Sequence, residues 1–190
     1  MDKELLRFYP TDEAPLDNNF PRWMPDDGIY GPFIPTSLYR VKLALKLADC
    51  KPGDIVADLG CGDGRFCAAA IILFDASFAV GIDSDATVIR IAETIVDQLS
   101  VNKLVNLNPQ KISFVTGDIC DINIGGIARD PSITILVAFL FPEFSFDFRD
   151  LLLAHFNRGC KIVAITFDLA NIPELTLIDN CDRMGENGIW

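Results

Sequence analysis

The sequence predicts a doubly wound α/β fold, in which helices cover both faces of a mostly parallel sheet. Two observations predict it. From residue 55 onward, short apolar runs typical of buried strands alternate with segments of helical periodicity. Residues 54–66 combine an apolar strand, three glycines at alternate positions (Gly60, Gly62 and Gly64) and the start of an apolar helix. This order is how α/β proteins bring bare backbone against a nucleotide-like ligand.

The chain of 190 residues is predicted to form an extended N-terminal arm over residues 1–35 and a single domain over residues 36–190. The arm is rich in Pro, Asp and aromatic residues and has little periodicity. We expect its aromatic side chains to pack on the domain. The domain is long enough to bury a substantial core, and a composition that is 50% hydrophobic suits a sheet covered on both faces.

Each element of the domain follows from a local signal. Thr36 or Ser37 can cap a helix that extends to about residue 48. The predicted strands are 55–60, 78–83, 112–118, 133–140 and 160–168, and the predicted helices are 64–74, 85–100 and 146–157. Residues 119–131 contain a Gly-Gly and an Asp-Pro step, so they are predicted to be a loop with room for one short helix. A sixth strand is expected near 175–179, and the seventh is expected to be short or missing.

Charge and composition exclude several classes of function. The net charge is −11 and no Lys/Arg cluster occurs, so general nucleic-acid binding is not expected. The acidic surface would attract a basic protein segment, or serve only to keep the chain dissolved. The apolar runs are too short for a membrane span. The six cysteines form no Cys-x-x-Cys pair, which predicts neither a metal site nor a disulfide framework and fits the cytoplasm.

Three acidic residues are predicted at or near the carboxyl ends of the first three strands, where open α/β sheets bind ligands. Asp83 lies about 20 residues beyond the glycine turn, the spacing at which a carboxylate accepts hydrogen bonds from both hydroxyls of a ribose. Asp118 is one strand further out and could accept from an adenine amino group while Ile119 packs on the ring. Asp58 precedes the first glycine.

A dinucleotide-binding domain is the main alternative for this pattern. Its glycine signature is G-x-G-x-x-G, and Arg65 stands where the third glycine would fall. Asp58 and Asp63 would also place negative charge near the pyrophosphate. A ligand that carries a cation and an ammonium group fits these acids better.

The segment Asp58–Gly64 (DLGCGDG) resembles the first motif of class I S-adenosylmethionine-dependent methyltransferases, which have a Rossmann-like fold. Gly81-Ile-Asp83 and Gly117-Asp118 resemble their next two motifs. The resemblance implies that the glycines line the methionine part of the cofactor, with Asp58 near its ammonium, Asp83 on its ribose and Asp118 on its adenine. The residues expected to bind the cofactor are Thr36, Asp58, Gly60, Cys61, Gly62, Gly64, Asp83, Ser84, Asp118 and Ile119.

Two further segments resemble a group of protein-lysine methyltransferases that includes the enzymes modifying the ATP synthase c subunit and their archaeal relatives. Residues 30–37 (YGPFIPTS) resemble the group's Pro-x-Val-Pro-Thr-Pro segment, which implies that Thr36 touches the cofactor. Residues 137–143 (VAFLFPE) are similar to its Tyr-Leu-Leu-Pro motif. Residues 133–167 also resemble the non-SET histone lysine methyltransferases. The resemblance implies a protein substrate that presents a lysine, and the acidic surface suits a basic segment around it.

Phe139 and Phe141 are the predicted catalytic residues. With Phe33, and with Tyr30 and Trp23 from the arm, they would line an apolar channel that lowers the pKa of the substrate lysine by desolvating its ammonium. Phe139 replaces the tyrosine that the group usually has. The Ser-His that the group has after the fifth strand is replaced by residues 164–167 (AITF).

Two alternatives therefore stay open beside lysine methylation. One is methylation of a small molecule or another protein side chain. The other is a non-catalytic subunit that binds the cofactor as a scaffold. His155 is the only histidine. It is predicted to pack on a helix away from the site rather than to act as a base.

Overall fold

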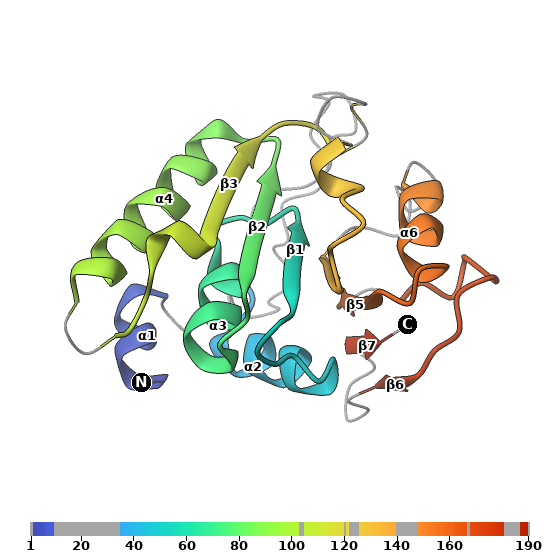
Figure 1. The fold of residues 1–190 in the computed structure, drawn as a ribbon, viewed down its shortest axis with the longest axis horizontal. Helices are drawn as coiled ribbons and strands as arrows, with labels where there is room; N and C mark the ends of the chain where they lie inside the picture. The colour runs from blue at the N-terminus through green and yellow to red at the C-terminus, as the bar shows by residue number, and fades with distance from the viewer. Residues whose placement is uncertain are drawn as a thin grey trace, which may run out of the picture.

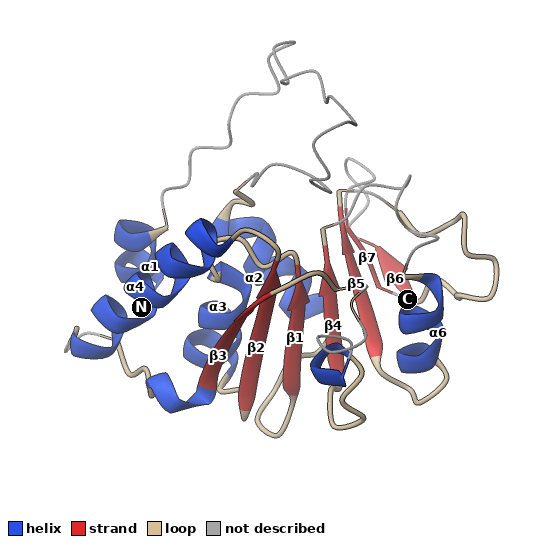
Figure 2. Cartoon of the chain, turned by 90° about the horizontal axis from the view of Figure 1, so that it is seen from above, coloured by secondary structure: helices blue, strands red, loops and turns tan. Residues whose placement is uncertain are grey.

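The computed structural model describes residues 2–9, 35–102, 105–119, 121, 126–139, 148–166, 168–180 and 187–189. A seven-stranded sheet in the order β3-β2-β1-β4-β5-β7-β6 forms its centre, with helices on both sides (Figures 1 and 2). Neighbouring strands from β3 to β5 are parallel, whereas β7 runs antiparallel to both of its neighbours. The predicted fold class is confirmed.

The strand predicted over 78–83 has the expected bounds, whereas the other four strands predicted in the domain core are shorter than expected. The strands are β1 (Ile55–Leu59), β2 (Phe78–Asp83), β3 (Ile112–Thr116), β4 (Ile135–Ala138), β5 (Lys161–Ile165), β6 (Asp179–Asn180) and β7 (Asn187–Ile189). Apolar residues continue past the ends of several ladders, so hydrophobicity alone overestimated strand length. The seventh strand is present, and its three residues pair with β5 and β6.

Side chains cap two of the four longer helices, and the other two begin without a side-chain cap hydrogen bond. The four helices are α2 (Leu38–Leu47), α3 (Arg65–Phe74), α4 (Ala86–Val101) and α6 (Arg149–Phe156), with a 3₁₀ turn, η2 (Pro109–Lys111), before β3. Of the two predicted caps for α2, Ser37 is the one used, because its hydroxyl accepts from the Arg40 N–H at 3.3 Å. Asp85 caps α4 by accepting from Thr87 N–H at 2.7 Å. The short helix predicted within 119–131 is a helical turn at 126–128.

The N-terminal prediction needs a correction. Residues 1–35 were predicted to form an extended arm, but Asp2–Phe8 is an α-helix, α1. Leu5 and Tyr9 are buried in the same apolar cluster as α2 and α3. Their packing, which no local pattern reveals, stabilises this short helix. The arm aromatics Phe20, Trp23, Tyr30 and Phe33 lie outside the described residues.

Two apolar clusters sandwich the sheet. Side chains alternate along each strand. Val56 and Ala79 therefore face the cluster formed with α1 to α4, whereas Ala57 and Val80 face the cluster formed with α6. In the described part of the chain, no helix is long and apolar enough to cross a bilayer.

Close backbone packing fixes the sheet end that carries the glycines. A Cβ on Gly81 of β2 would lie 2.7 Å from Cys61 Sγ and 2.8 Å from Phe114 Cδ1. A Cβ on Gly64 would lie 2.5 Å from Phe114 Cζ, and Gly64 also has a φ of +76°. The absence of side chains at these positions lets the turn after β1 settle onto β2 and β3.

We expect Gly81→Ala to destabilise the protein by about 1–3 kcal/mol or more, because the new methyl group would overlap Cys61 and Phe114. Chemical denaturation measures the change. The matched control is Gly126→Ala, where an added Cβ meets nothing within 4 Å, and its effect should stay within about 0.5 kcal/mol. Equal stability of the two variants would contradict the packing argument.

Candidate active site

The candidate site lies at the carboxyl ends of the parallel strands. β1 and β2 are paired with Asp58 opposite Gly81, so Asp83 stands two residues further along the neighbouring strand. Alternation of side chains places Asp58 and Asp83 on the face that carries α3. The strand register therefore brings two carboxylates, predicted separately from two motifs, to one edge of the sheet.

The glycine turn folds over the end of β2. The N–H groups of Gly60 and Cys61 both donate to the carbonyl of Ile82, at 2.8 and 3.0 Å. The φ angles of Gly60, Gly62 and Gly64 are 75°, 54° and 76°, all in the left-handed region. Three such residues at alternate positions explain why this turn needs glycines. Cys61 is buried, and burial raises the pKa of its thiol well above the usual value.

Asp83 is tied to the turn by hydrogen bonds. Its Oδ2 accepts from the N–H of Gly62 at 2.9 Å, and its Oδ1 accepts from the N–H of Asp85 at 3.0 Å. A carboxylate has about four acceptor positions, so both oxygens keep capacity for a ligand's hydroxyl groups. Ser84, between the two acids, is exposed. Asp83 thus holds the turn in shape and can also face a ligand.

Asp58 is a buried acid whose charge has little compensation. Its residue is 2% exposed. Burial, together with the nearby charges of Asp83 and Asp63, raises the pKa of Asp58 to about 8. Among the described residues, no cation forms an ion pair with Asp58. A ligand carrying an ammonium group at this position would supply the missing positive charge.

Asp63 differs from Asp58 because it has a cation. Arg65 donates from Nε and Nη2 to the two carboxylate oxygens of Asp63, at 2.8 and 2.5 Å. Its Nη1 donates to the backbone carbonyl of Thr36, just before α2. All three residues are buried. Arg65 thereby joins the glycine turn to the segment that carries Thr36, the predicted cofactor contact.

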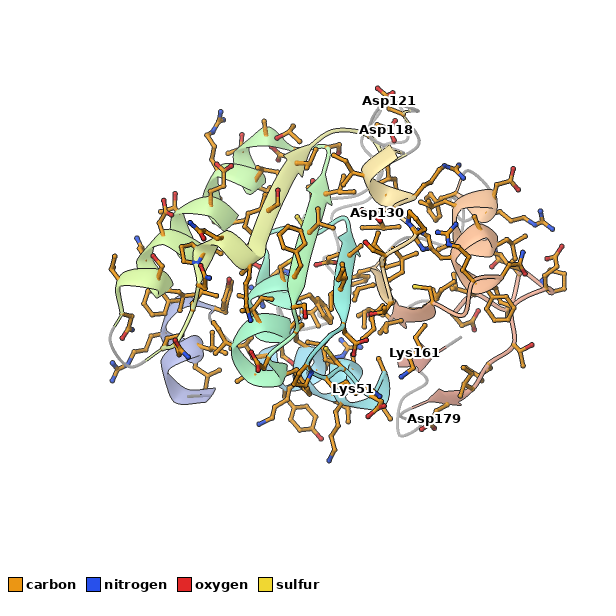
Figure 3. The ribbon with its side chains drawn as sticks, in the orientation of Figure 1. Lys51, Asp118, Asp121, Asp130, Lys161 and Asp179 are labelled. Carbon is orange, nitrogen blue, oxygen red and sulfur yellow. The ribbon has the colours of Figure 1, made fainter. Side chains whose placement is uncertain are left out.

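Asp118 and Ile119 lie beyond the end of β3 and are half-buried. The N–H of Gly117 donates to the carbonyl of Asp83 at 2.9 Å, which keeps the β3 end beside the β2 end. Figure 3 shows Asp118 at the sheet end marked by the arrowheads of β2 and β3. The geometry is compatible with the predicted adenine contact. The assignment of each site residue stays a prediction.

The ends of β4 and β5 form the other half of the site. Ala138 is paired with Leu59 on one side and with Ala164 on the other, so Phe139 follows β4 next to the start of the glycine turn. Phe139 is half-buried and packs on the cluster that includes α2 and α3. Phe141 lies outside the described residues.

Thr166, directly after β5, has a φ of +67°, which is unusual for a β-branched residue. Its hydroxyl oxygen is 3.4 Å from Arg40 Nη2. Strained residues of this kind gather at functional sites. Arg40 was not among the residues predicted from sequence, since an arginine in the first turn of a surface helix carries no distinguishing pattern.

His155 is away from this edge, as predicted. It is fully buried on α6, and its Nε2 lies 2.5 Å from the carbonyl oxygen of Ala128. Arg158 donates to its Nδ1 at 3.1 Å, so Nε2 carries the proton of a neutral ring. Burial lowers the pKa of His155. Its role is structural, because Nε2 holds the carbonyl of Ala128 to α6 and Nδ1 is occupied by Arg158.

Comparisons with known proteins agree with this geometry. No protein-family model matches the chain. It is 27% identical over 138 residues to a protein-lysine N-methyltransferase of Saccharolobus islandicus (strain REY15A), covering 73% of this chain and 78% of that protein. Among solved structures it resembles an RNA methyltransferase from Salinibacter ruber in complex with S-adenosyl-L-homocysteine. That match has a TM-score of 0.66 and 24% identity, and covers 83% of this chain and 92% of the other.

The chain has the class I methyltransferase fold. A second structure, a methyltransferase from Geobacter sulfurreducens with S-adenosyl-L-homocysteine bound, has a TM-score of 0.51, 20% identity and coverage of 83% of this chain and 54% of that one. The resemblance drawn from the glycine turn and the two following acid motifs is confirmed. The methyltransferase fold places all three motifs at one end of the sheet.

The raised pKa of Asp58 predicts a pH dependence of stability in the cofactor-free protein. The folded-state pKa of about 8 exceeds the ordinary value of 3.8 for an aspartate, so between these values only the folded state holds this proton. The contribution of Asp58 to the free energy of unfolding is therefore greatest below about pH 4. This contribution is lost as the pH rises to about 8, by at most about 1.4 kcal/mol per pH unit.

Asp58→Asn should remove this slope. Urea unfolding at several values between about pH 5 and pH 8 should show the wild-type protein losing more stability than the variant. Asp97→Asn, at an exposed position on α4, serves as the matched control and should keep the wild-type slope. If the free energy of unfolding fell equally with pH in wild type and Asp58→Asn, the pKa of Asp58 would not be raised in the folded state.

Proposed function

We propose that this protein is an S-adenosylmethionine-dependent protein-lysine N-methyltransferase. The observation that carries the proposal is the pairing of a glycine turn with two acids, Asp58 and Asp83, at one edge of the sheet. The 27% sequence identity to a protein-lysine N-methyltransferase supports both the activity and the substrate class.

The residues at this edge fit the charge of the cofactor. The uncompensated Asp58 suits an ammonium group, and the spare acceptor positions of Asp83 suit a ribose. The turn N–H groups are already bonded to Ile82 and Asp83, which suits a ligand without a phosphate at this position. S-adenosylmethionine would supply a methyl group already activated on a sulfonium sulfur. Thr36, Cys61, Ser84, Asp118 and Ile119 would complete the binding residues.

The task left to the protein is to align an uncharged amine with that methyl group. Phe139 stands beside the glycine turn, between the ends of β1 and β5, where a substrate side chain would approach. An apolar wall disfavours the ammonium form of a lysine, which lowers its pKa and favours loss of the proton to water. Phe141 would extend this wall. No general base from the chain is required.

The net charge of −11 suits a basic segment around the target lysine and opposes an RNA backbone.

We also propose that the protein acts in the cytoplasm. Its described cysteines, Cys50, Cys61, Cys67 and Cys160, are free thiols, as is usual in a reducing compartment. The division into an arm over residues 1–35 and a domain over 36–190 is retained, with α1 as a helix within the arm.

Transfer of labelled methyl from S-adenosylmethionine into a cell extract tests the function. Asp83→Asn should reduce the label in a discrete protein band by about a hundredfold, because it weakens the two charge-assisted hydrogen bonds that the carboxylate would accept from the ribose hydroxyls. Asp97→Asn, an exposed acid on α4, should behave as wild type. Label confined to RNA or to small molecules would overturn the protein substrate, and cofactor binding without any transfer would favour a scaffold.

The aromatic wall has its own test. Phe139→Ala should lower methyl transfer by about tenfold or more, since the amine loses alignment and desolvation. Binding of S-adenosylhomocysteine, measured by calorimetry, should change little. Tyr39→Ala, at an aromatic position of α2 that is 75% exposed, is the control and should retain full transfer. Unchanged transfer in Phe139→Ala would remove Phe139 from the catalytic site.

A further inference from the structure

The N-terminal helix reaches the base of the glycine turn. Tyr9, the residue after α1, is fully buried, and the centre of its ring lies 5.5 Å from Cζ of Arg65. Leu5, one turn earlier in α1, is 1% exposed. A segment far from the site motifs in sequence therefore packs on Arg65, which binds the glycine turn through Asp63.

Arg65 connects two parts of the site. It binds the Asp63 carboxylate with two donors, and it donates a third hydrogen bond to the Thr36 carbonyl. A planar guanidinium can make these contacts at once, whereas the point charge of a lysine cannot. Since Asp63 belongs to the glycine turn and Thr36 to the segment before α2, the orientation of Arg65 sets the spacing between them.

The ring of Tyr9 restrains that orientation. Cation–π attraction is stronger where water is excluded, and Tyr9 and Arg65 are 0% and 4% exposed. Burial raises the pKa of Tyr9, and the nearby Asp63 carboxylate raises it further, so the phenol stays neutral. Its hydroxyl has no hydrogen-bond partner in the described part of the chain. The ring rather than the hydroxyl is therefore the working group.

We infer that Arg65 is a positioning residue for cofactor binding and that Tyr9 holds its guanidinium in the productive orientation, so that the cofactor site requires α1. This inference rests on the proposed function. If the guanidinium turns away, Thr36 and the glycine turn lose their fixed spacing, and only a fraction of molecules can bind. The apparent dissociation constant then rises in inverse proportion to that fraction.

Paired substitutions at Tyr9 test the inference. Tyr9→Leu removes the aromatic face, whereas Tyr9→Phe keeps it and deletes only the unpartnered hydroxyl. Binding of S-adenosylmethionine and of S-adenosylhomocysteine is measured by calorimetry on the full chain, at a temperature where thermal unfolding shows each variant folded. We expect Tyr9→Leu to weaken both ligands by about tenfold. Tyr9→Phe should stay within about twofold of wild type, with a Tm that is not lower.

The two ligands separate positioning from charge. S-adenosylmethionine carries a sulfonium charge that S-adenosylhomocysteine lacks. A loss of spacing between Thr36 and the glycine turn would weaken the binding of both ligands equally. A change in local charge would instead shift the ratio of their dissociation constants. Arg65→Lys keeps the charge but not the planar fork, and should weaken both by a similar factor. This variant also tests the inference if Tyr9→Leu fails to fold. Tyr39→Leu, at an exposed aromatic position, is the control.

Wild-type affinity in folded Tyr9→Leu or Arg65→Lys would overturn the inference. So would equal weakening in Tyr9→Phe and Tyr9→Leu, which would assign the effect to the hydroxyl. A wild-type protein that binds neither ligand would instead overturn the proposed function, and the inference with it.

Discussion

The site depends on the burial of two carboxylates, Asp58 and Asp63, of which Asp63 is bound by the Arg65 guanidinium. Both acids are nearly inaccessible to water. Removing a carboxylate from water is costly unless a cation or hydrogen-bond donors replace the solvent. Arg65 meets that requirement for Asp63. Among the described residues Asp58 has no such cation, and in the proposed function the ammonium group of the cofactor would balance its charge.

Backbone packing makes the arrangement possible. The glycine turn bonds to the end of β2 through two N–H groups, and Cys61 occupies the space above Gly81. The carboxylate of Asp83 accepts a hydrogen bond from the Gly62 N–H of the turn. A side chain at Gly81 would separate the turn from β2, and the carboxylates of Asp58 and Asp83 would move apart. The small residues of the motifs are therefore as necessary to the site as its acids.

The site has two halves with different chemistry. The ends of β1, β2 and β3 present acids and turn backbone, which suit a polar cofactor. The ends of β4 and β5 present Phe139 and the strained Thr166 beside Arg40. A methyl transfer needs the same division, with a cationic donor on one side and an amine freed of its proton on the other. Under the inference drawn above, the N-terminal helix would support the cofactor half through the packing of Tyr9 on Arg65.

The sequence by itself determined the fold class, the motif residues and the starts of α2, α3 and α4. These depend on local signals: alternating apolar runs, alternate glycines, and caps such as Ser37 and Asp85. Only the tertiary structure decided which acid is neutralised. Asp58 and Asp63 look alike in the motif, and just one of them meets Arg65. Tyr9 escaped prediction for the same reason, since a contact between segments far apart in sequence leaves no periodic trace in either of them.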